Sequence, residues 1–227
     1  MASIGLIFTF FCIFSIFLPL ILRGYSPIIA AVLIVVIIST VTMILLNGVS
    51  IKSFCGILGT VIGVILSSLI LKCFGSLMHI SGYSTEEAES LLLISQTTKL
   101  NVKDLLYSGI LITSLGAIMD IAMSITSSVS EVQFHKPESS PIILYRVGMN
   151  VGKDIIGTMS NTLILAFTGT SLNLLVILSS YSVQFNQYMN MNNTAIEITQ
   201  ALAGSLALIL TVPLTALLSA LLLSKKI

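Results

Sequence analysis

The sequence predicts an all-α membrane protein, a polytopic bundle of about six transmembrane helices with short amphipathic segments. Of its 227 residues, 56% are hydrophobic, 8% are charged and none is tryptophan, which is far too apolar for a water-soluble domain. Apolar runs of roughly 20 residues, the length that crosses a bilayer, recur along the chain. No stretch between them is long enough for a soluble domain, so residues 1–227 are expected to form a single membrane domain.

The apolar runs place the predicted spans at residues 4–22, 27–47, 53–73, 105–128, 155–182 and 196–223, with amphipathic segments at 84–100 and 140–153. The first span is crowded with phenylalanine and is expected to be peripheral, with Pro19 bending or ending it. Pro27 suits the first turn of the second span. In the third span Gly59 and Gly63 have the spacing that lets helix backbones approach closely, which favours packing within the chain over a dimer contact.

The basic residues indicate the orientation in the membrane. Most lie in the second and fourth loops and at the C-terminus: Lys52, Lys136, Arg146, Lys153, Lys225 and Lys226. Fewer lie on the other side: Arg23, Lys72, Lys99 and Lys103. Because cytoplasmic loops of membrane proteins are enriched in lysine and arginine, both termini are predicted to be cytoplasmic.

The fourth span carries an acid where a membrane helix tolerates it least. We call its small and polar face the central polar stripe: Gly109, Thr113, Gly116, Asp120, Ser124, Ser127 and Glu131, at alternating spacings of four and three. An ionised carboxylate near the bilayer centre costs at least roughly 2.5–3.5 kcal/mol. Asp120 is therefore expected to face other helices or a wet cavity, or to be protonated.

Two further spans carry polar faces. The second polar stripe comprises Asp154, Gly157 and Asn161, with Thr158 and Thr162 beside them; the third comprises Glu197, Gln200 and Gly204. Each face is costly against lipid, and the other two can satisfy its polar groups, so the sequence predicts that they are buried together. We also predict that Asp120 and Asn161 lie within direct or one-water hydrogen-bond reach.

Three segments resemble the YibE/F family of bacterial multipass membrane proteins. They are GILITSLGAIMDIAMSITSSVSE from Gly109, GKDIIGTMSNTLILAFTGTSL from Gly152 and EITQALAGSLALILTVPLTAL from Glu197. The matching positions are Gly116 with Asp120, which is one residue wider than the family's Gly-x-x-Asp, then Glu131, Lys153 with Asp154, Asn161 to Leu163, and Glu197. The position of Lys153 is often arginine in that family.

The resemblance implies an integral protein of the bacterial cytoplasmic membrane, similar to the shorter, YibF-like member of a pair. It implies as partner a longer YibE-like membrane subunit or further copies of the chain, and it leaves the molecular activity undefined. A fainter likeness joins the fourth and fifth spans to proton-driven exporters of the RND, MMPL and SecD/SecF type.

The polar residues of these spans suggest two functions. The first is a transporter or permease subunit coupled to protons or cations, whose relay would use Asp120, Ser124, Glu131, Asp154, Asn161 and Thr162, supported by Gly116, Lys153 and Glu197. The alternative is a non-catalytic membrane scaffold or assembly partner, in which Asp120 is a structural acid hydrogen-bonded to a neighbouring helix.

Several of the other acids also have a structural interpretation. Glu131 and Asp154 would then be interfacial acids paired with Lys153, Lys136 or Arg146, and Glu197 would favour the N-terminus of the last helix through its dipole. No HExxH, GxSxG, paired-aspartate or Cys-His motif occurs, so we predict that the chain is not an enzyme. We predict no metal, no cofactor and no nucleic-acid partner; the bilayer is the expected environment.

Overall fold

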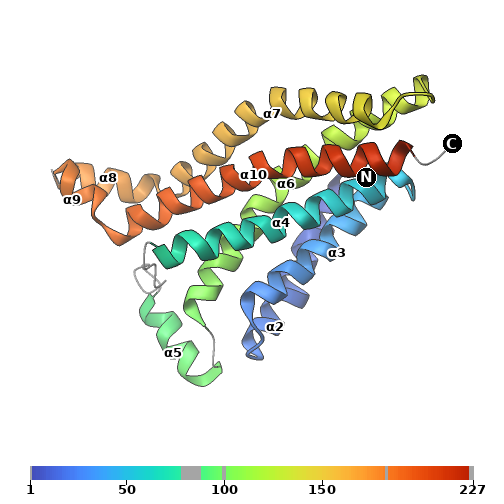
Figure 1. The fold of residues 1–227 in the computed structure, drawn as a ribbon. Coiled ribbons are helices and arrows are strands. Elements are labelled where there is room, and N and C mark those ends of the chain that lie inside the picture. The colour runs from blue at the N-terminus through green and yellow to red at the C-terminus, as the bar shows by residue number, and fades with distance from the viewer. Residues whose placement is uncertain (1, 78–87, 99–100, 182–183, 225–227) are drawn as a thin grey trace.

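A computed structural model describes residues 2–77, 88–98, 101–181 and 184–224, which form helices joined by short connections (Figure 1). The helices are α1 (Ala2–Cys12), the π-helix η1 (Ile13–Phe17), α2 (Leu18–Leu22), α3 (Pro27–Asn47), α4 (Ile51–Leu77), α5 (Ala88–Thr98), α6 (Val102–His135), α7 (Pro141–Thr170), α8 (Leu172–Ser180), α9 (Phe185–Met189) and α10 (Asn192–Ser224). The described ranges contain no strand. The predicted all-α fold class is therefore confirmed.

Five helical segments among the described residues are long and apolar enough to cross a membrane: Ser3–Leu22, Pro27–Asn47, Ile51–Leu77, Val102–His135 and Asn192–Ser224. They contain the predicted spans 27–47, 53–73, 105–128 and 196–223, mostly with extra turns at their ends. The N-terminal and C-terminal ends of the described chain lie at the same end of the bundle, opposite α8 and α9 (Figure 1).

The first span is one bent rod made of α1, η1 and α2. Proline has no backbone N–H, so Pro19 cannot complete the helical ladder behind it. The chain widens into a π turn just before that point, where the N–H of Leu18 bonds to the carbonyl of Ile13. The helix then continues past Pro19 and ends at Leu22, and the rod packs mainly against α3.

The segment 140–182 is organised differently from the expectation of an amphipathic helix followed by a span. One helix, α7, runs without interruption from Pro141 to Thr170, and a break at Ser171 separates it from the short helix α8. The expected span 155–182 is therefore divided between two helices. The part of it in α7 carries Asn161 and several threonines, and α7 is not among the five segments apolar enough to cross a membrane.

The core lies where α4, α6, α7 and α10 pack together, with α3 beside α4 and α6. Small residues let these helices approach closely, as the third span predicted. A β-carbon added at Gly59 of α4 would lie 2.6 Å from Oγ1 of Thr215 on α10, and one at Gly63 would lie 2.5 Å from Oγ1 of Thr211. The Gly59–Gly63 ridge is thus a contact inside the chain.

Glycines of α7 make the equivalent contact with α10 from the other side. A β-carbon at Gly148 would lie 2.9 Å from that of Ala216, and one at Gly152 would overlap Val212. One buried polar contact joins α6 to α10, where the hydroxyls of Thr126 and Ser219 lie 3.2 Å apart. These contacts fix the rotation of α6 and α7 about their axes, and with it the faces that remain outside.

Candidate functional site

The central polar stripe of α6 lies on the surface of the single chain. Gly109, Thr113, Gly116 and Asp120 are exposed, Ser124 and Ser127 are half-buried, and Glu131 is exposed again. The opposite face of α6 faces the core, where Leu111, Ile118, Ile121 and Ile125 are all 0% exposed. The predicted periodicity of α6 is therefore present, but its polar side faces outward.

The second polar stripe has the same orientation on α7. Asp154, Gly157, Asn161 and Thr162 are exposed, as is Lys153. The face of α7 that packs on α6 and α10 consists of small and apolar residues: Leu144, Gly148, Gly152, Leu163 and Phe167. The polar residues of α7 thus remain available to water, lipid or another helix.

The predicted mutual burial of the three polar faces is wrong for the single chain. Within the described residues neither Asp120 nor Asn161 makes a hydrogen bond, so the direct bond expected between them is not formed, and a bridge through one water stays a prediction. The physical reason is the packing of the glycines and branched apolar side chains, which join α4, α6, α7 and α10 through closely matched faces. The central and second polar stripes lie outside these contacts, and of the third stripe Gly204 is buried within them.

Open space surrounds the small residues of both exposed stripes. A β-carbon added at Gly109, Gly116 or Gly157 would meet nothing within 4 Å, whereas one added at Gly59 or Gly148 would collide with α10. Glycine at an exposed helix position is not required by packing inside the chain. Another backbone or a ligand can therefore approach α6 and α7 closely at these positions.

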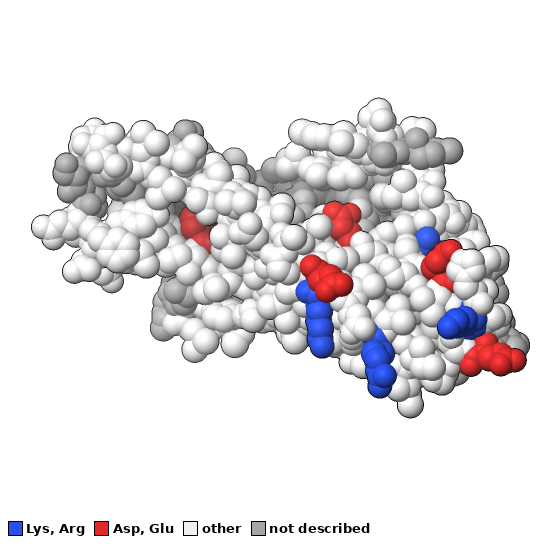
Figure 2. All heavy atoms as spheres, turned by 90° about the horizontal axis from the view of Figure 1, so that it is seen from above, with Lys and Arg blue, Asp and Glu red and all other residues white. Residues whose placement is uncertain are grey.

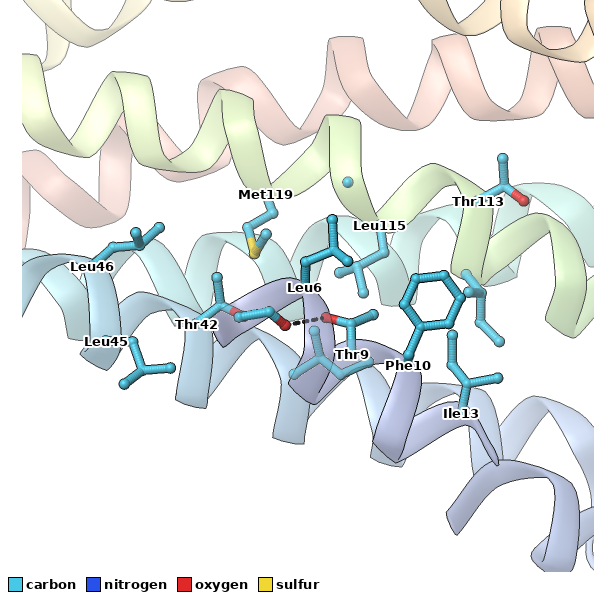
Figure 3. A pocket seen from close by; sticks show the side chains of 14 residues that line it. Leu6, Thr9, Phe10, Ile13, Thr42, Leu45, Leu46, Thr113, Leu115 and Met119 are labelled. Atoms are coloured by element: carbon cyan, nitrogen blue, oxygen red, sulfur yellow. Dashed lines mark hydrogen bonds between the residues drawn. The ribbon is translucent and has the colours of Figure 1, made fainter. Parts of the chain in front are cut away.

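Two cavities meet the exposed face of α6 at Thr113. The first, of about 430 Å³, is an apolar crevice between α1, α3 and α6, where Leu6, Phe10 and Met119 project into the space (Figure 3). Its wall on α6 reaches Gly116 and Met119, directly before Asp120. The second, of about 340 Å³, lies among α5, α6, α7 and α10 and is bordered by Thr113, Thr170 and Gln200. This cavity brings the central stripe close to the third one.

Charged side chains gather at the end of the molecule where α7 begins, and the other half of the same face is almost uncharged (Figure 2). At the end of α6, Glu131 bonds to His135 with Oε1 and Nε2 3.0 Å apart, and both side chains are exposed. Glu131 therefore pairs with His135 and not with Lys136, Lys153 or Arg146 as the sequence suggested. Asp154 has no ion pair among the described residues.

Glu197 lies apart from the other acids. It is half-buried on α10 and borders a third cavity, of about 370 Å³, with Thr194 and Tyr188. Sequence reasoning missed Thr194 and Tyr188. The spacing of three residues between Thr194 and Glu197 places both on one face of α10 and was the available signal; for Tyr188 the sequence contained none. Gly204, the last member of the third stripe, is buried against Leu163.

A bundle of long apolar helices with ionisable and small residues on its exposed faces defines the class of the protein: a multipass membrane protein with polar groups in its spans. The chain belongs to the YibE/F-like protein family, whose model matches residues 1–225. The comparisons with curated proteins and with solved structures found no match. The likeness to RND, MMPL and SecD/SecF exporters stays a prediction.

Proposed function

We infer that this protein is a transporter or permease subunit in which Asp120 binds and releases a proton or another cation. The observation that supports this proposal is the position of Asp120: it lies in an apolar helix, on an exposed face, with no hydrogen-bond partner among the described residues. An acid in that position is stable only where it meets water, a cation or a partner helix. A relay residue needs such access, because the proton must reach it from one side and leave to the other.

The surroundings of Asp120 support the same proposal. Gly116, one turn earlier, leaves the space beside the carboxyl group open. The crevice between α1, α3 and α6 ends at Met119, and the cavity bordered by Thr113 and Gln200 lies further along the same face. Asn161 and Asp154 on α7 are exposed polar groups on the helix beside α6. Hydration of this face would connect them to Asp120.

The alternative is a scaffold that assembles with a longer homologous membrane subunit. The open glycines favour it, because Gly109, Gly116 and Gly157 leave room for the backbone of a foreign helix along the exposed faces. In that arrangement the partner covers Asp120, and the acid has a structural role in the interface.

The experiment that separates these functions is proton flux into pyranine-loaded liposomes containing the chain alone or with the longer subunit. Asp120→Asn keeps the shape of the side chain but cannot carry a proton. Since no described residue bonds to Asp120, this variant is expected to insert normally, with a stability within about 0.5 kcal/mol of the wild type. If Asp120 relays protons, Asp120→Asn is expected to abolish proton flux and Asp120→Glu to retain part of it.

The scaffold predicts the reverse pattern. Asn is then tolerated, while the longer Glu side chain disturbs the fit of the partner helix and reduces co-purification of the longer subunit. Wild-type flux in the Asn variant, at wild-type expression, would remove the relay proposal and leave Asp120 as a structural acid.

We also propose that the protein resides in the bacterial cytoplasmic membrane with both termini in the cytoplasm. Support comes from the charge distribution. The exposed basic residues Lys136, Arg146 and Lys153 belong to the end of α6 and the first half of α7, the region where charged side chains gather in Figure 2.

A further inference from the structure

The cavity beside Glu197, the third of those described above, is a partly open space formed by other residues than the exposed face that carries Asp120. It has a volume of about 370 Å³ and lies among α7, α8, α9 and α10. Most of its wall is apolar or aromatic, including Phe167 of α7, Tyr188 and Met189 of α9, and Leu202 of α10. Its volume is that of a small organic molecule rather than of a single water or ion.

Two polar groups without partners border this cavity. Oε2 of Glu197 and Oγ1 of Thr194 are both buried, and neither has a hydrogen-bond partner in the part of the chain that the structure describes. The whole of Thr194 is only 3% exposed. Buried polar groups are normally satisfied, and a buried carboxylate without a counter-charge is especially costly. No lysine, arginine or histidine is among the described residues that line the cavity, so Glu197 has no counter-charge there.

We propose that this cavity binds an organic ammonium cation with apolar substituents, with Glu197 as its counter-charge. The carboxylate favours a cation, and the rings of Phe167 and Tyr188 provide aromatic surfaces on which a desolvated ammonium group is stabilised. A hard metal ion does not fit this wall, because calcium and magnesium require six or more oxygen ligands. A neutral apolar molecule would fill the space but leave Glu197 without a partner.

This inference goes beyond the proposed function and does not depend on Asp120. Cation binding at the cavity can be measured without transport. A failure of the relay proposal for Asp120 and a failure of the cation-binding proposal for Glu197 are therefore distinguishable. If both hold, organic cations are the substrate class, and Asp120→Asn removes coupled flux without removing cation binding.

The test uses the full chain in lipid nanodiscs and radiolabelled benzyltrimethylammonium in equilibrium dialysis, with empty nanodiscs as the partition blank. Neopentylbenzene, the neutral carbon isostere, serves as competitor. Wild-type protein is expected to bind the cation saturably, and the isostere is expected to compete at least about tenfold more weakly than unlabelled cation. Glu197→Gln should lower the affinity for the cation by a similar factor. The matched control Glu138→Gln removes an exposed acid in the loop before α7 and should leave the affinity unchanged.

Two further variants locate the bound cation. Because the chain contains no tryptophan, Tyr188→Trp creates a unique fluorophore at the cavity while keeping an aromatic ring, and its emission should change on titration with the cation. Thr168→Leu narrows the cavity from α7 and should weaken binding without altering the carboxylate.

The comparison of cation and isostere needs only the wild type, so it holds even if Glu197→Gln fails to fold. Equal competition by neopentylbenzene overturns the proposal and assigns the cavity to apolar ligands such as lipid chains. Wild-type affinity in folded Glu197→Gln, or no saturable binding at all, overturns it as well.

Discussion

Replacing Gly59 by alanine tests the close contact between α4 and α10. The added methyl group would lie 2.6 Å from Oγ1 and 2.9 Å from Cγ2 of Thr215, well inside van der Waals contact. The helices must separate or Thr215 must change rotamer, and overpacking of this kind costs about 1–3 kcal/mol. Gly109→Ala is the matched control on α6, because its methyl group meets nothing within 4 Å. Alanine is favoured over glycine in a helix by roughly 0.5–1 kcal/mol, so the control should be neutral or stabilising.

The free energy of unfolding is measured from SDS titrations in mixed micelles, followed by circular dichroism. The helix-propensity gain is common to both variants, so Gly59→Ala and Gly109→Ala are expected to differ by the overpacking cost of about 1–3 kcal/mol. Thr215→Ala removes the two side-chain atoms closest to the new methyl group, so the double variant with Gly59→Ala should recover most of the loss. Equal stabilities of the two glycine variants, or no recovery in the double variant, would refute the close α4–α10 contact.

Two predictions concern the interior and the orientation of the bundle. A double-mutant cycle with Thr126→Val and Ser219→Ala, followed by the same SDS titration, should give a coupling energy of about 0.6 kcal/mol, the average for hydrogen bonds between membrane helices; additive effects would contradict the contact seen at 3.2 Å. The orientation is tested by cysteine labelling of intact cells with an impermeant maleimide, in a variant without native cysteines. With both termini in the cytoplasm, Val49→Cys and Glu138→Cys should be protected from the reagent and Asn186→Cys should react. Protection of Asn186→Cys together with labelling at the other two sites would show the opposite orientation.

The existence and the approximate limits of most spans were predictable from the sequence. Pro27 starts α3 and Gly48, with φ of 70°, ends it, so its predicted limits agree with the observed ones. The division of 140–182 was not predictable in the same way. Run length alone placed a span at 155–182, while the structure interrupts the helix at Ser171, a residue with no strong helix-breaking character. Ordinary helix propensity cannot locate such a break.

The polar faces were predictable as faces, but their direction was not. In a water-soluble helix the apolar side is the buried side, so the periodicity of the sequence gives the orientation. In a membrane helix both the core and the lipid are apolar. The same periodicity therefore does not tell which face of the helix points to the core. The glycines show this ambiguity: Gly59 and Gly152 are buried in contacts with α10, whereas Gly109 and Gly116 face open space. No local feature distinguishes the two sets.

The cavity at Glu197 depends on a contact that crosses several connections. The spacing of Thr194 and Glu197 on α10 was visible in the sequence, but their surroundings depend on the break at Ser171 and on the position of α9. Tyr188 contributes to the wall only because α9 lies beside the start of α10. An aromatic residue in a short segment carries no sequence signal that it lines a cavity. Only the three-dimensional arrangement shows that Tyr188 does so.

The exposure of Asp120 limits what the protein can be in a membrane. Facing hydrocarbon, its ionised form would cost at least roughly 2.5–3.5 kcal/mol, which is a large part of the stability of an ordinary domain. Within the described residues this cost is not offset by a hydrogen bond or an ion pair. The face of α6 must therefore be hydrated, neutralised by a proton or cation, or covered by another helix. A transporter requires that water, a proton or a cation reaches Asp120, whereas a scaffold requires that a partner helix covers it. The open glycines beside Asp120 leave room for either arrangement.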